Sequence, residues 1–154
     1  MDPVSAIGLA SAVLSFIDFG TKIISGTKQI YDATSGVKQD NLTLEVVVRN
    51  LQELSTKLSG PDPENRTESD KDLCELAAEC KRLAEDLNQL LDRIKPKVKG
   101  SKWHSFVSAL KNERFAGEKE ELRVRLEACR GQLHFKLSYV TRWEAIHFYQ
   151  VPIY

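Results

Sequence analysis

Residues 2–31, DPVSAIGLASAVLSFIDFGTKIISGTKQIY, decide the fold of this chain. Asp2 followed by Pro3 is a helix-start signal, because aspartate caps a first turn and proline at the first helical position sacrifices no hydrogen bond. No residue in the range 4–17 is charged. Its apolar side chains point in every direction on a helical wheel, which predicts a half-helix with no face toward water. The whole stretch predicts a long N-terminal helix over about residues 3–33.

The surroundings of the uncharged half decide its function. Its fourteen residues give a helix of about 21 Å, against about 30 Å for the hydrocarbon core of a bilayer. It is therefore expected to be too short to span a membrane alone. The interpretations that remain are a helix buried in its own bundle, a helix that inserts shallowly or as an oligomer, and a signal peptide. The acid after Met1 and the helical pattern that continues beyond residue 17 disfavour a signal peptide.

Length and composition predict one domain. The chain has 154 residues and a formal net charge of zero. The charge is uneven, because residues 61–95 carry six basic against ten acidic side chains, whereas residues 96–154 carry eleven against six. Such a separation indicates internal pairing or contact with an anionic surface. Three scattered cysteines fit a reduced compartment, and two of them, Cys80 and Cys129, lie on predicted apolar faces as small buried residues.

The rest of the chain predicts further helices, which gives an all-α bundle of four to five helices. Apolar residues recur at helical spacing, and Gly and Pro separate the segments. The expected helices cover about residues 41–58, 69–95, 102–113 and 118–140, so that the bundle occupies residues 1–140. Residues 141–154 form an aromatic tail. It either extends the last helix as far as Gln150 or serves as a docking or membrane-interface segment, or it packs across its own bundle.

No catalytic motif is found. His104, His134 and His147 are scattered, and the chain contains neither a phosphate-binding loop nor a nucleophile motif. We therefore expect a protein that is not an enzyme, with no cofactor, metal or small-molecule substrate.

One basic patch stands out around the segment that precedes the fourth expected helix. It is too short, in a neutral domain, to favour nucleic acid. It is either a solvated loop or a site for anionic lipid, to which each basic residue near the surface contributes about 1 kcal/mol. Its members are Lys97, Lys99, Lys102, Trp103, Lys111 and Arg114.

Three motifs resemble one protein family. They are the opening MDP with FIDFGTK at residues 16–22 and IY at residues 30–31, then KWHSFVSALK at residues 102–111, and LRVRLEACRGQL at residues 122–133. Together they are similar to the N-terminal domains of fungal NOD-like receptors, whose next domain is a NACHT nucleotide-binding module. The resemblance covers about residues 1–138.

The resemblance extends to the HeLo and HeLo-like group and implies a function. Those helical bundles are proposed to execute regulated cell death in non-self recognition, including heterokaryon incompatibility, by releasing a hydrophobic N-terminal helix into the plasma membrane. It implies a cytoplasmic resting state and, as partners, other copies of the chain, receptor chains or anionic lipid. The residues that would carry membrane insertion and oligomerisation are Val4, Ile7, Gly8, Leu9, Val13, Leu14, Phe16 and Ile17.

Two features depart from the family. No NACHT phosphate-binding loop follows within the 154 residues, and the tail after Tyr139 does not look like the usual continuation. We expect an excised domain, a stand-alone member or a truncated gene product. The competing hypothesis is an adaptor or autoinhibitory bundle whose first helix never leaves the core.

Overall fold

The structure, a computed structural model, describes residues 3–26, 43–59, 68–94 and 103–148. Every regular element in these ranges is helical, which confirms the all-α fold with five α-helices. They are α1 (Pro3–Ser25), α2 (Leu44–Lys57), α3 (Glu68–Ile94), α4 (Trp103–Leu110), the 3₁₀ helix η2 (Glu113–Phe115) and α5 (Ala116–Phe148).

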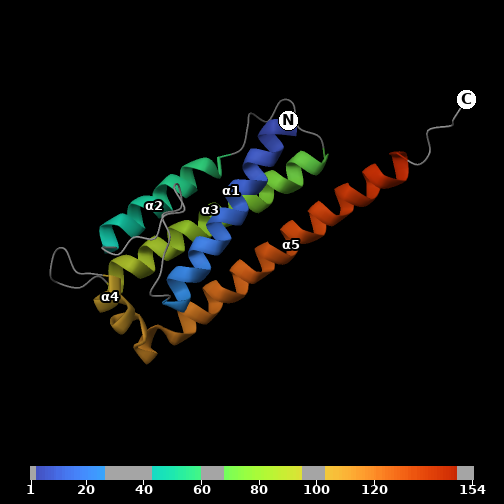
Figure 1. The fold of residues 1–154 in the computed structure, drawn as a ribbon. Helices are drawn as coiled ribbons and strands as arrows, with labels where there is room; N and C mark the ends of the chain where they lie inside the picture. Colours follow the sequence, from blue (N-terminus) through green and yellow to red (C-terminus); the bar gives the residue numbers. More distant parts are fainter. Residues whose placement is uncertain (1–2, 27–42, 60–67, 95–102, 149–154) are drawn as a thin grey trace, which may run out of the picture.

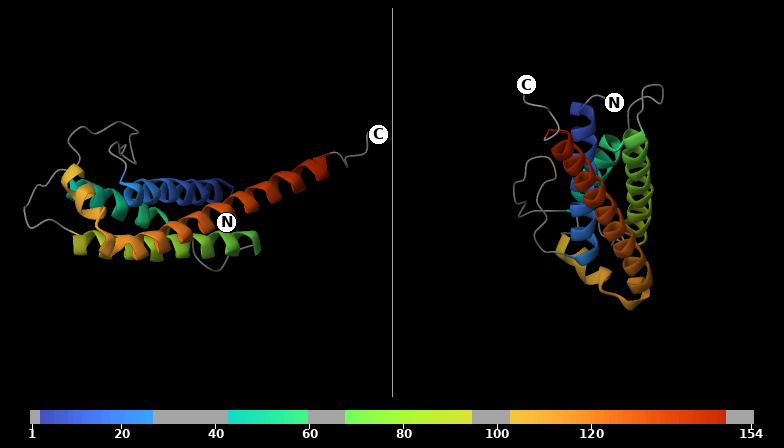
Figure 2. Two further views of the ribbon diagram at one scale, coloured as in Figure 1. Left: turned by 90° about the horizontal axis from the view of Figure 1, so that it is seen from below. Right: turned by 90° about the vertical axis from the view of Figure 1, so that its right-hand side faces the viewer.

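The helix α1 is the centre of the bundle, in contact with α2, α3 and α5 (Figure 1). The helix α5 runs antiparallel to both α1 and α3, and α4 with η2 closes one end (Figures 1 and 2). Apolar side chains at helical spacing from all five α-helices form one continuous core. Its fully buried members on α1 are Val13, Phe16, Ile17 and Ile23.

The first helix ends earlier than expected. It stops at Ser25, and Gly26 takes a left-handed conformation with φ 64°. The N–H of Gly26 donates a hydrogen bond to the carbonyl of Ile23 at 3.1 Å, which is a typical helix stop. The described helix therefore ends at Ser25, short of the predicted residue 33, because Gly26 turns the backbone out of the helical conformation. Residues 27–33 lie outside the described ranges.

Other boundaries differ by a few residues. The second helix begins at Leu44 rather than residue 41, because the Thr43 hydroxyl accepts a hydrogen bond from the N–H of Val46 at 3.4 Å and caps the helix. The fourth helix ends at Leu110 rather than residue 113, since Asn112 caps η2 through its side-chain oxygen. The third helix agrees with its expected bounds to within one residue at each end.

The last helix is longer than residues 118–140. Its backbone continues to Phe148 and projects past the ends of α1 and α3, instead of folding back across the bundle (Figures 1 and 2). The predicted helical extension of the tail is therefore present for residues 141–148. The tip of the tail, residues 149–154, lies outside the described ranges. Leu137 continues the inward stripe of α5 but is 49% exposed, because the bundle no longer covers the helix there.

The three cysteines differ sharply in exposure, and this gives a first testable prediction. Cys80 and Cys129 are buried and hydrogen-bonded to each other, whereas Cys74 is half-buried. Donating that hydrogen bond and being buried raise the pKa of the Cys80 thiol. In a titration with a chromogenic disulfide reagent, we expect Cys74 to react in the folded protein and the other two thiols only on unfolding. Fast reaction of all three thiols in native buffer would contradict this packing.

Candidate functional site

The helix α1 has two faces, which corrects the prediction that its first half has no side toward water. Four residues at helical spacing are exposed and form what we call the α1 ridge, namely Ile7, Ser11, Leu14 and Asp18. Ile7 is 70% exposed and Leu14 41% exposed. The helical wheel did not predict this exposed face, because the α1 ridge carries large apolar residues and no polar stripe marks it.

The structure divides the predicted membrane residues into two groups. Ile7, Gly8 and Leu14 lie on the exposed side. The side chain of Val4 lies outside the described residues. The remaining four are buried in the core, namely Leu9, Val13, Phe16 and Ile17. Three of the predicted membrane residues therefore belong to the surface and four to the core.

Two glycines of α1 have different surroundings. A Cβ atom at Gly8 would meet nothing within 4 Å, so close packing in the bundle does not require this glycine. A Cβ atom at Gly20 would lie 3.3 Å from side-chain carbons of Leu87 and Leu126. Gly20, which no sequence pattern marked as a packing position, therefore permits the close approach of α1 to both α3 and α5.

The apolar part of α1 is also longer than the uncharged stretch. By length and composition, the segment from Ser5 to Ser25 could cross a membrane, and half of it is buried in the bundle. Its 21 residues correspond to about 31 Å of helix, close to the thickness of the hydrocarbon core. The expectation that the helix is too short to span a membrane applies to the uncharged residues 4–17. The longer segment includes the charged residues Asp18 and Lys22. Core helices of soluble proteins and signal sequences have the same property.

An ion pair links the charged end of the α1 ridge to α5. The guanidinium of Arg130 lies 3.3 Å from the carboxylate of Asp18, and both side chains are partly exposed. Water screens such a pair, so it contributes about 0.2–1 kcal/mol. It is a weak link between α1 and α5, compared with the buried apolar contacts of α1.

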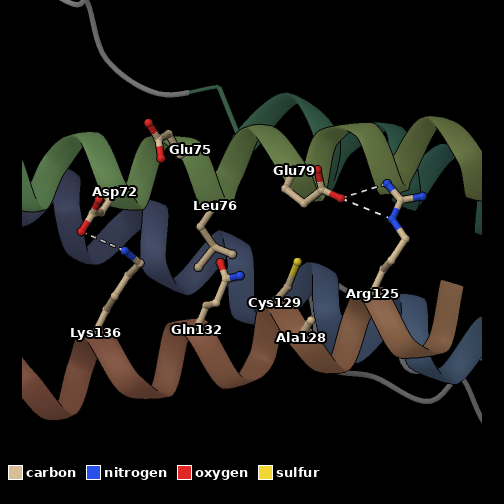
Figure 3. Close-up of a pocket in the computed structure, with 9 residues that line it drawn as sticks. All are labelled: Asp72, Glu75, Leu76, Glu79, Arg125, Ala128, Cys129, Gln132 and Lys136. Atoms are coloured by element: carbon tan, nitrogen blue, oxygen red, sulfur yellow. Dashed lines mark hydrogen bonds and ion pairs between the residues drawn. The ribbon is translucent and has the colours of Figure 1, made fainter. Parts of the chain in front are cut away.

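Stronger charge pairing joins α3 to α5 along a groove of about 330 Å³ (Figure 3). Arg125 donates hydrogen bonds to Glu79 at 2.9 Å and to Asp86 at 2.7 Å. Lys136 pairs with Asp72 at 3.0 Å farther along the groove. The hydrogen bond from Arg125 holds the pKa of Glu79 below its ordinary value of 4.5. These ion pairs hold α3 and α5 together along the groove.

The Glu79 pair makes stability depend on pH. Because the pKa of Glu79 is lowered in the folded state, the pair stabilises the fold above pH 4.5 and loses this contribution as pH falls through the lowered value. We expect Glu79→Gln to lower the free energy of unfolding by about 0.5–1 kcal/mol near neutral pH, and by less in acid. Urea unfolding at several pH values measures this difference. The control is Glu75→Gln, which changes a carboxylate in the same groove; a constant deficit for Glu79→Gln at all pH values would contradict the assignment.

The structure brings together only part of the predicted basic patch. Lys97, Lys99 and Lys102 lie outside the described residues, as does the side chain of Trp103, the first residue of α4. Lys111 and Arg114 are exposed in the connection from α4 to α5. The Arg114 guanidinium lies over the ring of Phe115, 5.8 Å from its centre. In the described part of the chain, no group of three or more His, Cys, Asp or Glu residues is arranged to hold a metal ion.

Comparison with known proteins identifies the family. The model of the SesA family, described as an N-terminal domain on NACHT NTPases and P-loop NTPases, matches residues 10–132. No curated protein and no solved structure matches the chain. The match begins within α1, after its first two turns, includes α2, α3 and α4, and ends within α5. This chain therefore belongs to the SesA family of N-terminal domains, which precede NACHT and P-loop NTPase modules and fit a signalling or effector role.

Proposed function

We propose that this domain is a non-catalytic effector of an NLR-type system of fungal non-self recognition, which self-associates and acts on membranes through α1 to induce regulated cell death. The observation that carries the proposal is the double character of α1. Its ridge exposes Ile7 and Leu14 to solvent, while Val13, Phe16 and Ile17 on the opposite side are fully buried. An exposed apolar ridge on a helix long enough to enter a bilayer offers a first contact with lipid.

The mechanism is a population shift between two locations of α1. In the resting state, each large apolar side chain buried on α1 contributes about 1.5–3 kcal/mol relative to exposure to water. The hydrocarbon core of a membrane shields the same side chains from water, so lipid offsets most of the cost of leaving the bundle. A partner or a second copy that binds the opened bundle would shift the equilibrium further.

Basic side chains near the connection from α4 to α5 are proposed to assist membrane binding. Lys111 and Arg114 are exposed there. We propose that they attract anionic lipid, at about 1 kcal/mol for each basic residue near the surface. The resting protein is then cytoplasmic, and the plasma membrane is the place of action. The function needs no cofactor, metal or small-molecule substrate, and no nucleic acid.

The second candidate is an adaptor whose first helix stays in the core. The complete burial of Val13, Phe16 and Ile17 favours it, because these side chains already have a dry environment. In this case the α1 ridge would dock on a protein partner, such as the NTPase module that follows in the family. The two candidates make opposite predictions for pure lipid vesicles.

Dye release separates the candidates. The effector function predicts that the whole chain releases dye from vesicles with anionic lipid, and releases less from vesicles of zwitterionic lipid alone. A folded sample that binds no vesicles and releases no dye at any concentration would favour the adaptor. Deletion of residues 1–17 is unsuitable as a control, since it removes three fully buried core side chains and would unfold the bundle.

A further inference from the structure

Two thiols face each other where α3 packs on α5. Cys80 on α3 is 0% exposed and Cys129 on α5 is 2% exposed, and the two are hydrogen-bonded to each other. The Cys129 side chain points from α5 toward α3 (Figure 3). The third thiol, Cys74, is half-buried elsewhere on α3. The proposed action of α1 on membranes uses none of these thiols.

The ion pairs between the two helices support the same juxtaposition independently. Two of them lie on either side of the thiols, namely Arg93 with Glu118 and Asp72 with Lys136. Counting along the antiparallel helices between these pairs places Cys80 level with Cys129. Cα atoms of residues that face each other on helices packed at the usual distance lie about 4–6 Å apart. A disulfide needs about 4.4–6.8 Å, so a bond between the two sulfurs requires little movement of the backbone.

Cys129 is the thiol that a small oxidant can reach. It lines the groove of about 330 Å³ between α3 and α5, whereas Cys80 is fully buried in the core. The hydrogen bond from Cys80 lowers the pKa of the Cys129 thiol, and the charge of Arg125 acts in the same direction, although burial and the charge of Glu79 oppose it. Because the thiolate is the nucleophile, oxidation begins at Cys129. A peroxide is much smaller than an aromatic disulfide reagent, so the groove admits the peroxide where it excludes the reagent.

We propose that Cys80 and Cys129 are a site of reversible oxidation, at which hydrogen peroxide forms a disulfide that joins α3 to α5. The Cys129 thiolate attacks one oxygen, the O–O bond breaks, and the sulfur becomes a sulfenic acid while hydroxide leaves and takes up a proton. The Cys80 sulfur then attacks the sulfenic sulfur, the S–S bond forms, and water leaves with the Cys80 proton. The two thiols are thereby oxidised by two electrons, and the peroxide is reduced to two water molecules.

The disulfide fixes two helices that both contact α1. It closes the chain between residues 80 and 129 into one loop, and a loop of this length strongly restricts the unfolded chain. Oxidation therefore stabilises the resting bundle, whereas under reducing conditions the two thiols remain small core side chains. The inference goes beyond the proposed action on membranes, and its test needs no vesicles.

Peptide mapping of the whole Cys74→Ser chain tests the inference. The substitution is needed because trypsin leaves Cys74 and Cys80 on one peptide, residues 72–81. After treatment with hydrogen peroxide in native buffer, alkylation and digestion without reductant, we expect peptide 72–81 linked to peptide 126–130 in monomeric protein. The midpoint of urea unfolding should rise by roughly 1–3 M, and dithiothreitol should restore the original value.

Cys80→Ala is the matched control, because it also leaves two cysteines and keeps Cys129. Cys74 lies six residues before Cys80, which places it on a different face of α3, so it should not link to Cys129 under the same treatment. The change removes one sulfur atom, and the variant should keep the helical circular dichroism spectrum.

Four results would overturn the inference. The linked peptides could be absent from the oxidised Cys74→Ser chain, or occur only between two chains. Oxidation could leave the urea midpoint of that chain unchanged or lower it. The peptides of Cys80→Ala could also link as fast as those of Cys74→Ser, which would show that the link does not depend on the facing of Cys80 and Cys129.

Discussion

Replacing Leu14 by glutamate is expected to abolish dye release from anionic vesicles while the bundle stays folded. Leu14 is 41% exposed on the α1 ridge, so a charge there can remain hydrated in the resting state. We expect the free energy of unfolding to change by about 1 kcal/mol or less. In the membrane, however, a carboxylate near the centre of a helix costs about 2.5–3.5 kcal/mol or more. Dye release and urea unfolding of the same samples measure the two effects separately.

Two controls separate this effect from simple charge repulsion. Thr56→Glu adds the same charge at an exposed position on α2, and it should release dye like the wild type. Leu14→Met keeps an apolar side chain of similar size and should also remain active. If Leu14→Glu releases dye as fast as Thr56→Glu, the α1 ridge does not enter the membrane.

A pair of identical substitutions on α1 is expected to give the largest difference in stability. Ile17 is fully buried and Ile7 is 70% exposed, on the same helix. Ile17→Ala removes methyl and methylene groups from a packed core, and should lower the free energy of unfolding by about 2–5 kcal/mol. Ile7→Ala should change it by less than about 0.5 kcal/mol. Urea unfolding followed by circular dichroism measures both variants.

The comparison tests whether α1 is a structural part of the resting bundle. Equal and small effects at both positions would mean that α1 is detached in solution, which would contradict the observed core. Equal and large effects would mean that Ile7 is covered in solution by another molecule. Ultracentrifugation of the wild type at the same concentration would then identify a second copy as the cover.

The sequence predicted the helices well, because apolar spacing and turn residues are local signals. Apolar residues recur at helical spacing along the whole of α3, and this pattern alone predicted the helix. The boundaries were less certain, since they depend on single residues in context. Gly26 ends α1 by adopting a left-handed conformation, although residues 2–31 as a whole had predicted one continuous helix.

The candidate site was only half predictable. The importance of α1 followed from its composition, but its exposed side did not, because Ile7 and Leu14 are as apolar as the buried residues around them. Ion pairs between helices could not be predicted from the sequence either. Arg125 and Glu79 are 46 positions apart, and only the antiparallel packing of α3 and α5 brings them together. The exposed Val124 and Phe135 of α5 were not predicted either, since a helix with apolar residues on two opposite sides has no single apolar face to detect.

Amide hydrogen exchange in the presence of vesicles tests most directly whether α1 leaves the bundle. Departure of α1 would remove Val13, Phe16 and Ile17 from the core that they share with α2 and α3. With anionic vesicles, amides of α2 and of the middle of α3 should therefore exchange much faster, while amides of α1 stay protected as a helix in lipid. If the vesicles release dye while α2 and α3 keep their protection, α1 acts without leaving the core, and the proposed mechanism is contradicted.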